Sequence, residues 1–291
     1  MEWAWQQQSV WSQTADKLKA GPTRLRSLRL ALTVVAAALA LAGSQVKPVS
    51  LPASTALAVA AALALAGTGL LSGRASAEQV RRWTRARSVS EALKSEVFLF
   101  LSASGGYSNA DRERRLEAEV QRLEREAGGL RRYTAGIRAR ERPLPAVHDT
   151  RSYLDVRVRD SQLEGFYEPK ARFMLKRLRL LKVVQVTLAL VAAGLAATAA
   201  VWPSVAAWAA VVTTAGGAVA AYLAAERYEF LWIEYSRTAS ELRRLLDRRT
   251  AADGRPLSDA ELIAECEQVI SVQNQAWMAK WGEEDITVAA D

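Results

Sequence analysis

"AATAAVWPSVAAWAAVVTTAGGAVAAYLAA", from Ala196 to Ala225, contains no charged residue and lies in a run without formal charge from residue 183 to residue 225. A second run of this kind extends from residue 30 to residue 73, and Lys47 is its only charged residue. A helix needs about 20 residues to cross the ~30 Å hydrocarbon core of a bilayer. Each run is therefore long enough for two spans, and Pro48 and Pro203 mark a turn near the middle of each.

The sequence predicts an all-α membrane protein with four transmembrane helices arranged as two parallel-repeat hairpins, together with long cytoplasmic helices. The predicted spans are residues 30–46, 53–71, 183–202 and 205–223. Buried helices of a soluble protein are a poorer interpretation, because such helices normally expose one polar face to water. A cleaved signal peptide fits the first run poorly, because this run starts late, is too long and is followed by a second hairpin.

Basic residues flank the predicted spans on one side. They precede the first span (Lys17, Lys19, Arg24, Arg26, Arg29), follow the second (Arg74, Arg81, Arg82, Arg85, Arg87) and precede the third (Lys170, Arg172, Lys176, Arg177, Arg179, Lys182). By the positive-inside rule, both termini and the middle of the chain are expected in the cytoplasm. These residues also account for much of the net charge of +8, so we expect a lipid bilayer as partner and no nucleic acid.

The charged remainder of the chain reads as helix, without a convincing strand pattern. Residues 77–101 continue from the second span, and the next helix is expected to be capped by Ser108 or Asn109. A further helix, capped by Asp149 or Thr150, is expected to run into the third span with a bend near Pro169.

The two halves of the chain look like copies of one unit. "WTRARSVSEAL", which begins at Trp83, is similar to "WIEYSRTASEL", which begins at Trp232. Ser108 and Ser258 are separated by about the same number of positions as these two segments. Ser258 and Glu261 have the spacing of a capping box. We therefore expect a first two-span unit at residues 1–139, a proline-containing linker at 140–150 and a second two-span unit at 151–291.

The stretch "YLDVRVRDSQLEGFYEPKA" (153–171), followed by basic residues and a hairpin, resembles the start of a SLATT domain, a two-transmembrane effector domain whose family includes DUF4231. The likeness is carried by Tyr153, Arg157, Gln162, Phe166, Tyr167, Lys170 and Ala171, and then by Tyr235, Ala239 and Leu242. The family usually has Trp-Tyr where this chain has Phe166-Tyr167. The N-terminal half resembles a more divergent unit through Trp5, Gln7, Trp11 and Ala15.

The resemblance implies a bacterial inner-membrane effector of a prokaryotic conflict or defence system. Such an effector is proposed to oligomerise and to form a pore or disrupt the membrane when a nucleotide or another signal arrives. A nucleotide-signalling or sensor protein encoded elsewhere is then a possible partner, because no sensor domain is recognisable in this sequence. The alternative is a non-conducting membrane scaffold whose cytoplasmic helices recruit a partner protein.

The residues that an enzyme would need are sparse, and we expect neither catalysis nor a cofactor. His148 is the only histidine and falls in the proline-containing linker. Cys266 is the only cysteine, so we expect a packed, reduced thiol, and no Cys/His cluster can hold zinc. The segment at residues 102–112 is rich in small residues but lacks the Lys-Ser/Thr end of a phosphate-binding loop. We interpret it as a turn between helices, with a ligand-binding role as the alternative.

The predicted spans contain small residues and no ionisable group, which disfavours a proton pump or an ion-coupled transporter. Small and hydroxyl residues recur in the second and fourth spans: Gly67, Thr68, Gly69, Thr213, Thr214, Gly216 and Gly217. Such residues allow helices to pack closely, either within one chain or at a subunit interface or pore lining. Four alanine-rich spans enclose no obvious channel, so a pore requires a homo-oligomer around an axis.

The helix that precedes the third span carries the long polar side chains of Arg157 and Gln162. We expect Arg157, or a neighbour such as Lys170, to pair with acidic residues of the helix that leaves the fourth span. The candidates are Glu226, Glu229, Glu234 and Glu241. The alternative is a local pair of Arg157 with Asp160.

Overall fold

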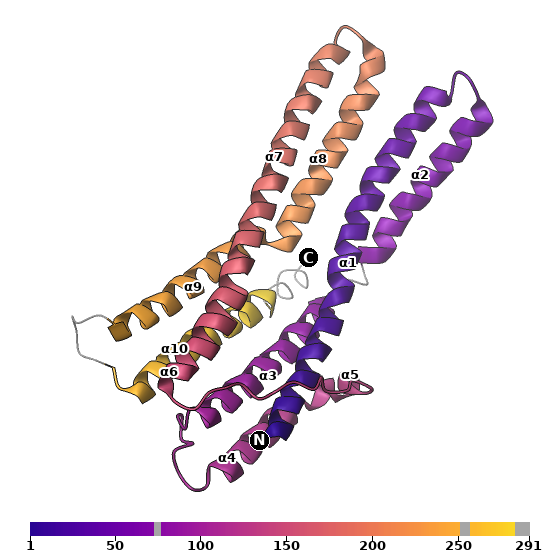
Figure 1. Cartoon of the computed structure of the whole chain (residues 1–291). Helices are drawn as coiled ribbons and strands as arrows, with labels where there is room; N and C mark the ends of the chain where they lie inside the picture. The colour runs from indigo at the N-terminus through magenta and orange to yellow at the C-terminus, as the bar shows by residue number, and fades with distance from the viewer. Residues whose placement is uncertain (73–76, 251–256, 283–291) are drawn as a thin grey trace. The chain divides into compact units, whose positions relative to one another are not determined.

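The computed structural model describes residues 1–72, 77–250 and 257–282, and this part of the chain contains helices and no strand (Figure 1). In chain order the helices are α1 (Glu2–Val46), α2 (Leu51–Ser72), α3 (Ala77–Leu101), α4 (Arg112–Glu126), η1 (Gly128–Leu130), α5 (Arg131–Thr134), α6 (Thr150–Tyr153), η2 (Leu154–Tyr167), α7 (Glu168–Ala199), η3 (Pro203–Val205), α8 (Ala206–Glu226), α9 (Tyr228–Thr250) and α10 (Asp259–Gly282). The all-α fold class predicted from the sequence is confirmed.

In the part of the chain that the structure describes, four helical segments are long and apolar enough to cross a membrane: Glu2–Val46, Leu51–Leu71, Thr150–Ala199 and Pro203–Arg248. They contain the four predicted spans, except that α7 already ends at Ala199 and not at Trp202. Trp202 is extended (φ −121°, ψ 91°) because the ring of Pro203 disfavours a helical conformation in the residue before it.

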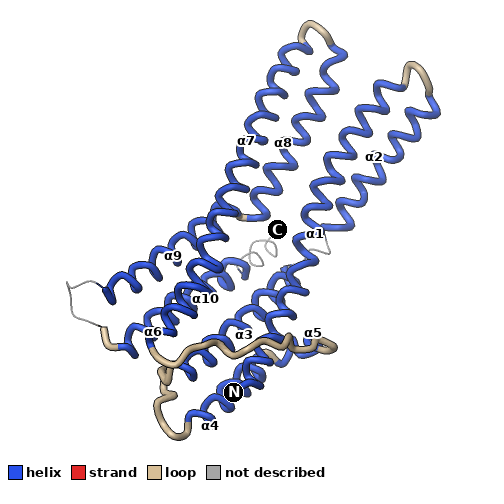
Figure 2. Tube along the Cα trace, in the orientation of Figure 1, coloured by secondary structure: helices blue, strands red, loops and turns tan. Residues whose placement is uncertain are grey.

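These helices form two hairpins, α1 with α2 and α7 with α8 (Figure 2). In the first hairpin, the Ser54 hydroxyl donates to the Gly43 carbonyl at 2.8 Å. A Cβ atom on Gly43 would lie 3.3 Å from the backbone oxygen of Ser54, so glycine permits this close approach. In the second hairpin, Gly216 faces Leu188 of α7.

The chain divides into two compact units, and each unit combines segments from both halves of the sequence. We call Gly21–Ser76 with Phe173–Leu231 the hairpin unit, and Met1–Ala20, Ala77–Arg172 and Trp232–Asp291 the helical unit. Within the helical unit, α3 is the central element, because both α4 and α10 pack against it. The first repeat therefore meets the second through α3 and α10.

The start of α4 differs from the prediction. Its N-cap is Asp111, which makes no side-chain capping bond, while Ser108 and Asn109 lie in the preceding turn. This turn contains Ala103, Gly105 and Gly106 at positive φ and buries Tyr107, whose hydroxyl donates to the Glu96 carboxylate. Burial of this tyrosine keeps the segment in a turn beyond the predicted cap. The segment is a connection between helices, as predicted.

The other two predicted caps are present. Asp149 caps α6 in a capping box with Ser152. Ser258 caps α10: its amide donates to the Glu261 carboxylate at 2.9 Å, and the Glu261 amide donates back to the Ser258 hydroxyl at 3.3 Å.

We call α6 with η2, which contain the start of the stretch quoted above from residue 153, the motif helix. It also differs from the prediction, because residues Leu154–Tyr167 form a π-helix and not an α-helix. Its buried residues recur at intervals of four or five, as i→i+5 hydrogen bonding requires: Leu154, Val158, Gln162 or Leu163, and Tyr167. Gly165 permits this geometry, because a Cβ atom there would lie only 2.5 Å from the Asp160 carbonyl oxygen. At Glu168, next to Pro169, the helix changes from π to α, where the sequence predicted a bend.

Candidate functional site

The best-defined polar site in the helical unit is centred on Arg157, whose side chain is fully buried. Its Nε donates to Oε1 of Glu267 at 2.9 Å, and its Nη2 donates to Oε2 of the same carboxylate at 3.1 Å. The Tyr153 hydroxyl, one turn earlier on the helix, donates to Glu267 Oε1 at 2.8 Å. Glu267 of α10 thus accepts three hydrogen bonds from the motif helix of its own repeat.

The first repeat contributes charges from α3. Glu91 Oε2 lies 4.0 Å from Arg157 Nη1, and Arg87 Nη2 lies 2.7 Å from Glu91 Oε1. Lys94, one turn further along α3, donates to the Ser161 hydroxyl of η2 at 3.0 Å. We call Arg157, Glu267, Glu91, Arg87, Lys94 and Tyr153 the ionic cluster. It joins α3 of the first repeat to η2 and α10 of the second.

The cations of the cluster keep its two buried carboxylates ionised. Burial alone would raise the pKa of the Glu91 and Glu267 carboxyls, but the neighbouring cations outweigh it and lower both pKa values. For Glu91 the strongest of these cations is Arg87, and for Glu267 it is Arg157. For Lys94, burial together with Arg157 lowers the pKa to about 8. Lys94 is therefore the member of the cluster that is closest to losing its charge near neutral pH.

Aromatic rings extend the cluster toward α1. The Arg157 guanidinium lies 5.0 Å from the centre of the Phe98 ring, which makes edge contacts with Tyr153 at 6.4 Å and with Trp5 at 6.2 Å. On α1, the Gln8 amide donates to the Ser90 hydroxyl at 3.0 Å, next to Glu91. The N-terminal part of α1 is therefore tied to the same region of α3 as the motif helix.

The predicted partner of Arg157 was wrong. Three of the four acidic candidates have other cationic partners: Glu226 lies 3.6 Å from Arg26, Glu229 pairs with Lys182 at 3.1 Å, and Glu241 pairs with Arg237 at 3.0 Å. Arg157 itself pairs with Glu267. Lys170 is half-buried and lies outside the cluster. The local alternative, a pair of Arg157 with Asp160, was also wrong, because the Arg157 guanidinium pairs with Glu267. Arg157 points to α10 and α3 because the π-helical repeat places it on the buried face of η2.

The remaining motif residues pack the motif helix against α9. The Phe166 ring lies 5.7 Å from that of Tyr235, and the Tyr167 ring lies 6.3 Å from the same residue. Gln162, Tyr167, Ala171, Tyr235, Ala239 and Leu242 are buried. In the N-terminal half, Trp5, Trp11 and Ala15 are buried, but the buried glutamine is Gln8, whereas Gln7 is only half-buried. Most of the motif residues thus lie in the core of the helical unit.

The linker between the repeats lies against α1 as a strap, which we define as residues 137–148. Gln13 donates to the Arg138 carbonyl at 2.9 Å, the Arg140 amide donates to the Ser9 hydroxyl at 3.0 Å, and Trp5 Nε1 donates to the Pro143 carbonyl at 3.0 Å. The three partners on α1 are four residues apart and share one face. The strap is therefore held in register along α1. His148 lies in it and is exposed, as predicted.

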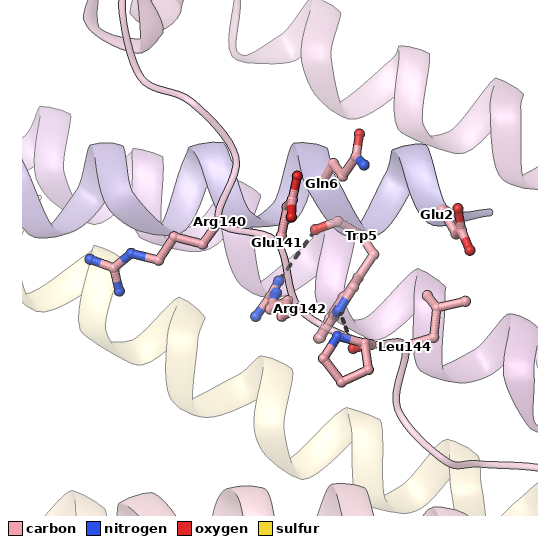
Figure 3. A pocket seen from close by; sticks show the side chains of 8 residues that line it. Glu2, Trp5, Gln6, Arg140, Glu141, Arg142 and Leu144 are labelled. Carbon is pink, nitrogen blue, oxygen red and sulfur yellow. Dashed lines mark hydrogen bonds between the residues drawn. The ribbon is translucent and has the colours of Figure 1, made fainter.

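Figure 3 shows where the strap meets Trp5. The Arg142 guanidinium stacks 3.6 Å from the centre of the indole ring and donates to the Trp5 carbonyl at 3.3 Å. An open cleft of about 660 Å³ lies between this pair and the start of α1, where Glu2 and Glu141 line it. Its charges are mixed and mostly exposed, so it does not define a ligand by its chemistry.

The small residues of the spans fall into two groups. Cβ atoms on Gly67 and Gly216 would lie 3.5 Å from Leu32 and 3.7 Å from Leu188, so these two glycines face the other helix of their hairpin. Gly69 and Gly217 have open space around them. The hydroxyls of Thr68, Thr213 and Thr214 donate to carbonyls of their own helices, and Thr213 and Thr214 are exposed.

Glu267 and Glu91 were not among the residues predicted from the sequence, although the position of Glu267 is informative. It stands among the apolar residues of α10 that are buried: Leu262, Ile263, Cys266 and Ile270. A charge on such a face needs a buried partner. Cys266 beside it is buried, as predicted, and burial with the nearby carboxylates raises the pKa of its thiol to about 12. Among the described residues, no group of three or more His, Cys, Asp or Glu side chains could hold a metal ion.

Comparison with known families gave two matches. Residues 153–277 match the SMODS and SLOG-associating 2TM effector domain 1, SLATT_1, and residues 9–115 match DUF4231, a family described as a protein of unknown function. No curated protein and no solved structure matched the chain significantly. The two matched segments correspond to the two halves of the internal repeat.

Proposed function

Because the chain belongs to the SLATT-domain family and carries two tandem units, we propose that it is an effector of a prokaryotic conflict system that acts on the inner membrane. In this proposal several copies assemble in the bilayer and form a pore or disrupt the membrane. The helical unit lies in the cytoplasm and controls that step. The name of the family that matches the second repeat, a two-transmembrane effector domain, supports this class of function.

The observation that carries the proposal is the exposure of the apolar helices. In the most apolar stretch of each candidate span, at most 11% of the residues are buried, and in the segment Thr150–Ala199 none are. A monomeric bundle of four spans would bury one face of each helix against the others. This surface is available to lipid and to further copies of the chain, so it supports both membrane insertion and assembly.

The turn of the second hairpin supports a membrane boundary at that point. Trp202 and Trp208 flank Pro203 and are 62% and 50% exposed. Tryptophan is favoured at the interface between hydrocarbon and headgroups, where its apolar ring and its N–H group can both be satisfied. Together with the basic residues at the opposite end of the hairpin, these tryptophans support a turn that lies outside the cytoplasm.

The outward small residues of α8 support contacts between copies. Gly217 has open space around it, and the hydroxyls of Thr213 and Thr214 are satisfied within their own helix. A helix face of this kind lets another helix approach closely without leaving a polar group unpaired. Several copies around an axis would then enclose a path that one copy lacks.

The proposal is tested by two measurements on the full chain. The mass of the detergent-solubilised particle gives the number of copies. The chain is then reconstituted into vesicles that contain a self-quenched dye, with and without an extract from cells that carry its genetic neighbours. We expect more than one copy and dye release that depends on the protein. An oligomer that never releases dye, in either condition, would instead support the scaffold. A monomer that releases no dye would contradict the effector proposal.

A further inference from the structure

In the helical unit, the two repeats meet through an interface to which they contribute different surfaces. We call it the directional interface. The first repeat contributes α3 and the second contributes η2 and α10. The contacts join Glu91 to Arg157, Phe98 to Tyr153 and Lys94 to Ser161, and Arg87 lies 5.7 Å from the Phe166 ring. The first repeat uses α3, the helix that follows its hairpin, whereas the second repeat uses η2, the helix that precedes its hairpin, together with α10. The two surfaces differ, so the interface is heterologous.

The corresponding helix of the second repeat could not replace α3 in this interface. The repeat offset of 150 aligns Glu91 with Glu241 but Phe98 with Arg248. Phe98 is 2% exposed and contacts Arg157, Tyr153 and Trp5, whereas Arg248 is exposed and pairs with Glu265 at 3.7 Å. An arginine in the place of Phe98 would face the Arg157 guanidinium. A second repeat therefore recognises a first repeat and not another second repeat.

The covalent tether between the two repeats is held on α1 of the first repeat, so these contacts can persist when the second repeat changes its partner. The described strap residues 140–143 are exposed, and the strap contacts α1 through hydrogen bonds to Gln13, Ser9 and Trp5 and through the stacking of Arg142. Gly136, where the strap leaves α5, has a φ of +76°, and a Cβ atom there would meet nothing within 4 Å. The tether thus begins at a residue that can change direction without a steric penalty.

We infer that in the assembled state copies of this chain exchange their second repeats, so that α3 of one copy binds η2 and α10 of the next. The same contacts form within one chain or between two chains, and exchange of an identical element therefore costs little beyond rearrangement of the tether. Because each copy donates one second repeat and accepts another, repeated exchange forms a ring of copies when the rotation between neighbours closes. This inference rests on the proposed assembly and names the surface that links its members.

Cross-linking tests the exchange in the full chain, in a Cys266→Ser background. One copy carries Lys94→Cys and one affinity tag, and a second copy carries Ser161→Cys and another tag. After co-expression in the membrane, a short bismaleimide should give a product that carries both tags. A single chain with both substitutions reports the contact within one chain. A copy with Ser108→Cys, in an exposed turn, replaces the Lys94→Cys copy as the collision control.

The inference predicts a two-tag product that disappears with the Ser108→Cys control. The product should also be absent when the two copies are purified separately and then mixed, because exchange requires the interface to open. Cross-links only within the double-cysteine chain would overturn the inference, even if the particle is an oligomer, and would leave the proposed function intact. If the first pair perturbs folding, Arg87→Cys with Phe166→Cys tests the same interface.

Discussion

Arg157 and Glu267 are separated by 110 positions in the sequence and are joined by two parallel hydrogen bonds in the interior of the helical unit. The Arg157 side chain is fully buried, and that of Glu267 is 11% exposed. A buried pair of this kind is costly to break, because the partner that remains is a desolvated charge.

We expect Arg157→Met to lower the free energy of unfolding by about 3–5 kcal/mol, because it leaves Glu267 without its principal cation. Glu267→Met should cost a similar amount. The double variant should lose clearly less than the sum, because neither charge is then stranded. Chemical unfolding of the full chain in detergent measures all four corners of the cycle.

The exposed pair Arg159 and Asp155, on the same helix, is the matched control. Both side chains are more than 40% exposed, so breaking this pair should cost less than about 1 kcal/mol. Strictly additive losses at Arg157 and Glu267, or equal losses at the two pairs, would show that the buried pair is not energetically coupled.

Lys94 should make stability depend on pH in the alkaline range. Burial and Arg157 lower its pKa from the ordinary 10.5 to about 8 in the folded protein. Between these values the unfolded chain binds more protons than the folded chain, so this residue makes stability rise with pH. Below pH 8 both states are protonated, and the full cost of burying the charge is present.

The measurement is the difference in unfolding free energy between the wild type and Lys94→Met from pH 7 to pH 10. Above pH 8, the unfolding free energy of the wild type should rise relative to that of the variant, by up to about 1.4 kcal/mol per pH unit. The subtraction removes other groups that titrate in this range, such as Cys266 with its raised pKa. Parallel curves for the two proteins would refute the assignment.

The sequence was sufficient for the helices because their signals are local. Charge segregation marked the runs that became the hairpins, and the capping residues Asp149 and Ser258 act within one helical turn. Ser108 gave the same local signal and failed, because burial of Tyr107 and three residues at positive φ keep its surroundings in a turn. A tertiary contact outweighed the preference for a cap.

The ionic cluster could not be predicted in this way. Acidic residues on α3, α9 and α10 are all candidate partners of Arg157. Which of them pairs with Arg157 depends on which helix packs against the motif helix. The π-helical repeat decides it by turning Arg157 and Tyr153 toward Glu267. The spacing of four or five between the apolar residues of this segment was a usable sign, and the glycine at position 165 was another.

Topology is tested by single cysteines in a Cys266→Ser chain. Ser204 lies exposed in the turn of the second hairpin, and Ser108 lies exposed between α3 and α4. Basic flanks favour a cytoplasmic location for the segments outside the hairpins. An impermeant maleimide added to intact cells should therefore label Ser204→Cys and leave Ser108→Cys unlabelled until the cells are opened. Ser258 is unsuitable for this test because it caps α10. Labelling of Ser108→Cys in intact cells would reverse the orientation.

Two adjacent glycines of α8 allow packing within a hairpin and packing between copies to be tested separately. A Cβ atom on Gly216 would lie 3.7 Å from Leu188, whereas one on Gly217 would meet nothing within 4 Å. Gly216→Leu should therefore force α7 and α8 apart and lower the melting temperature. Gly217→Leu should leave the hairpin stable but obstruct a neighbouring copy, because the added side chain keeps the two backbones apart.

The readouts are the thermal stability of each variant and its particle mass in detergent. Gly67 and Gly69 repeat the comparison in the first hairpin, since a Cβ atom on Gly67 would lie 3.5 Å from Leu32 and one on Gly69 has open space. We expect the outward variants, Gly69→Leu and Gly217→Leu, to reduce the copy number at unchanged stability in at least one hairpin. If both outward variants keep the copy number of the wild type, the contacts between copies lie elsewhere, and the directional interface of the helical unit would then have to hold the assembly alone.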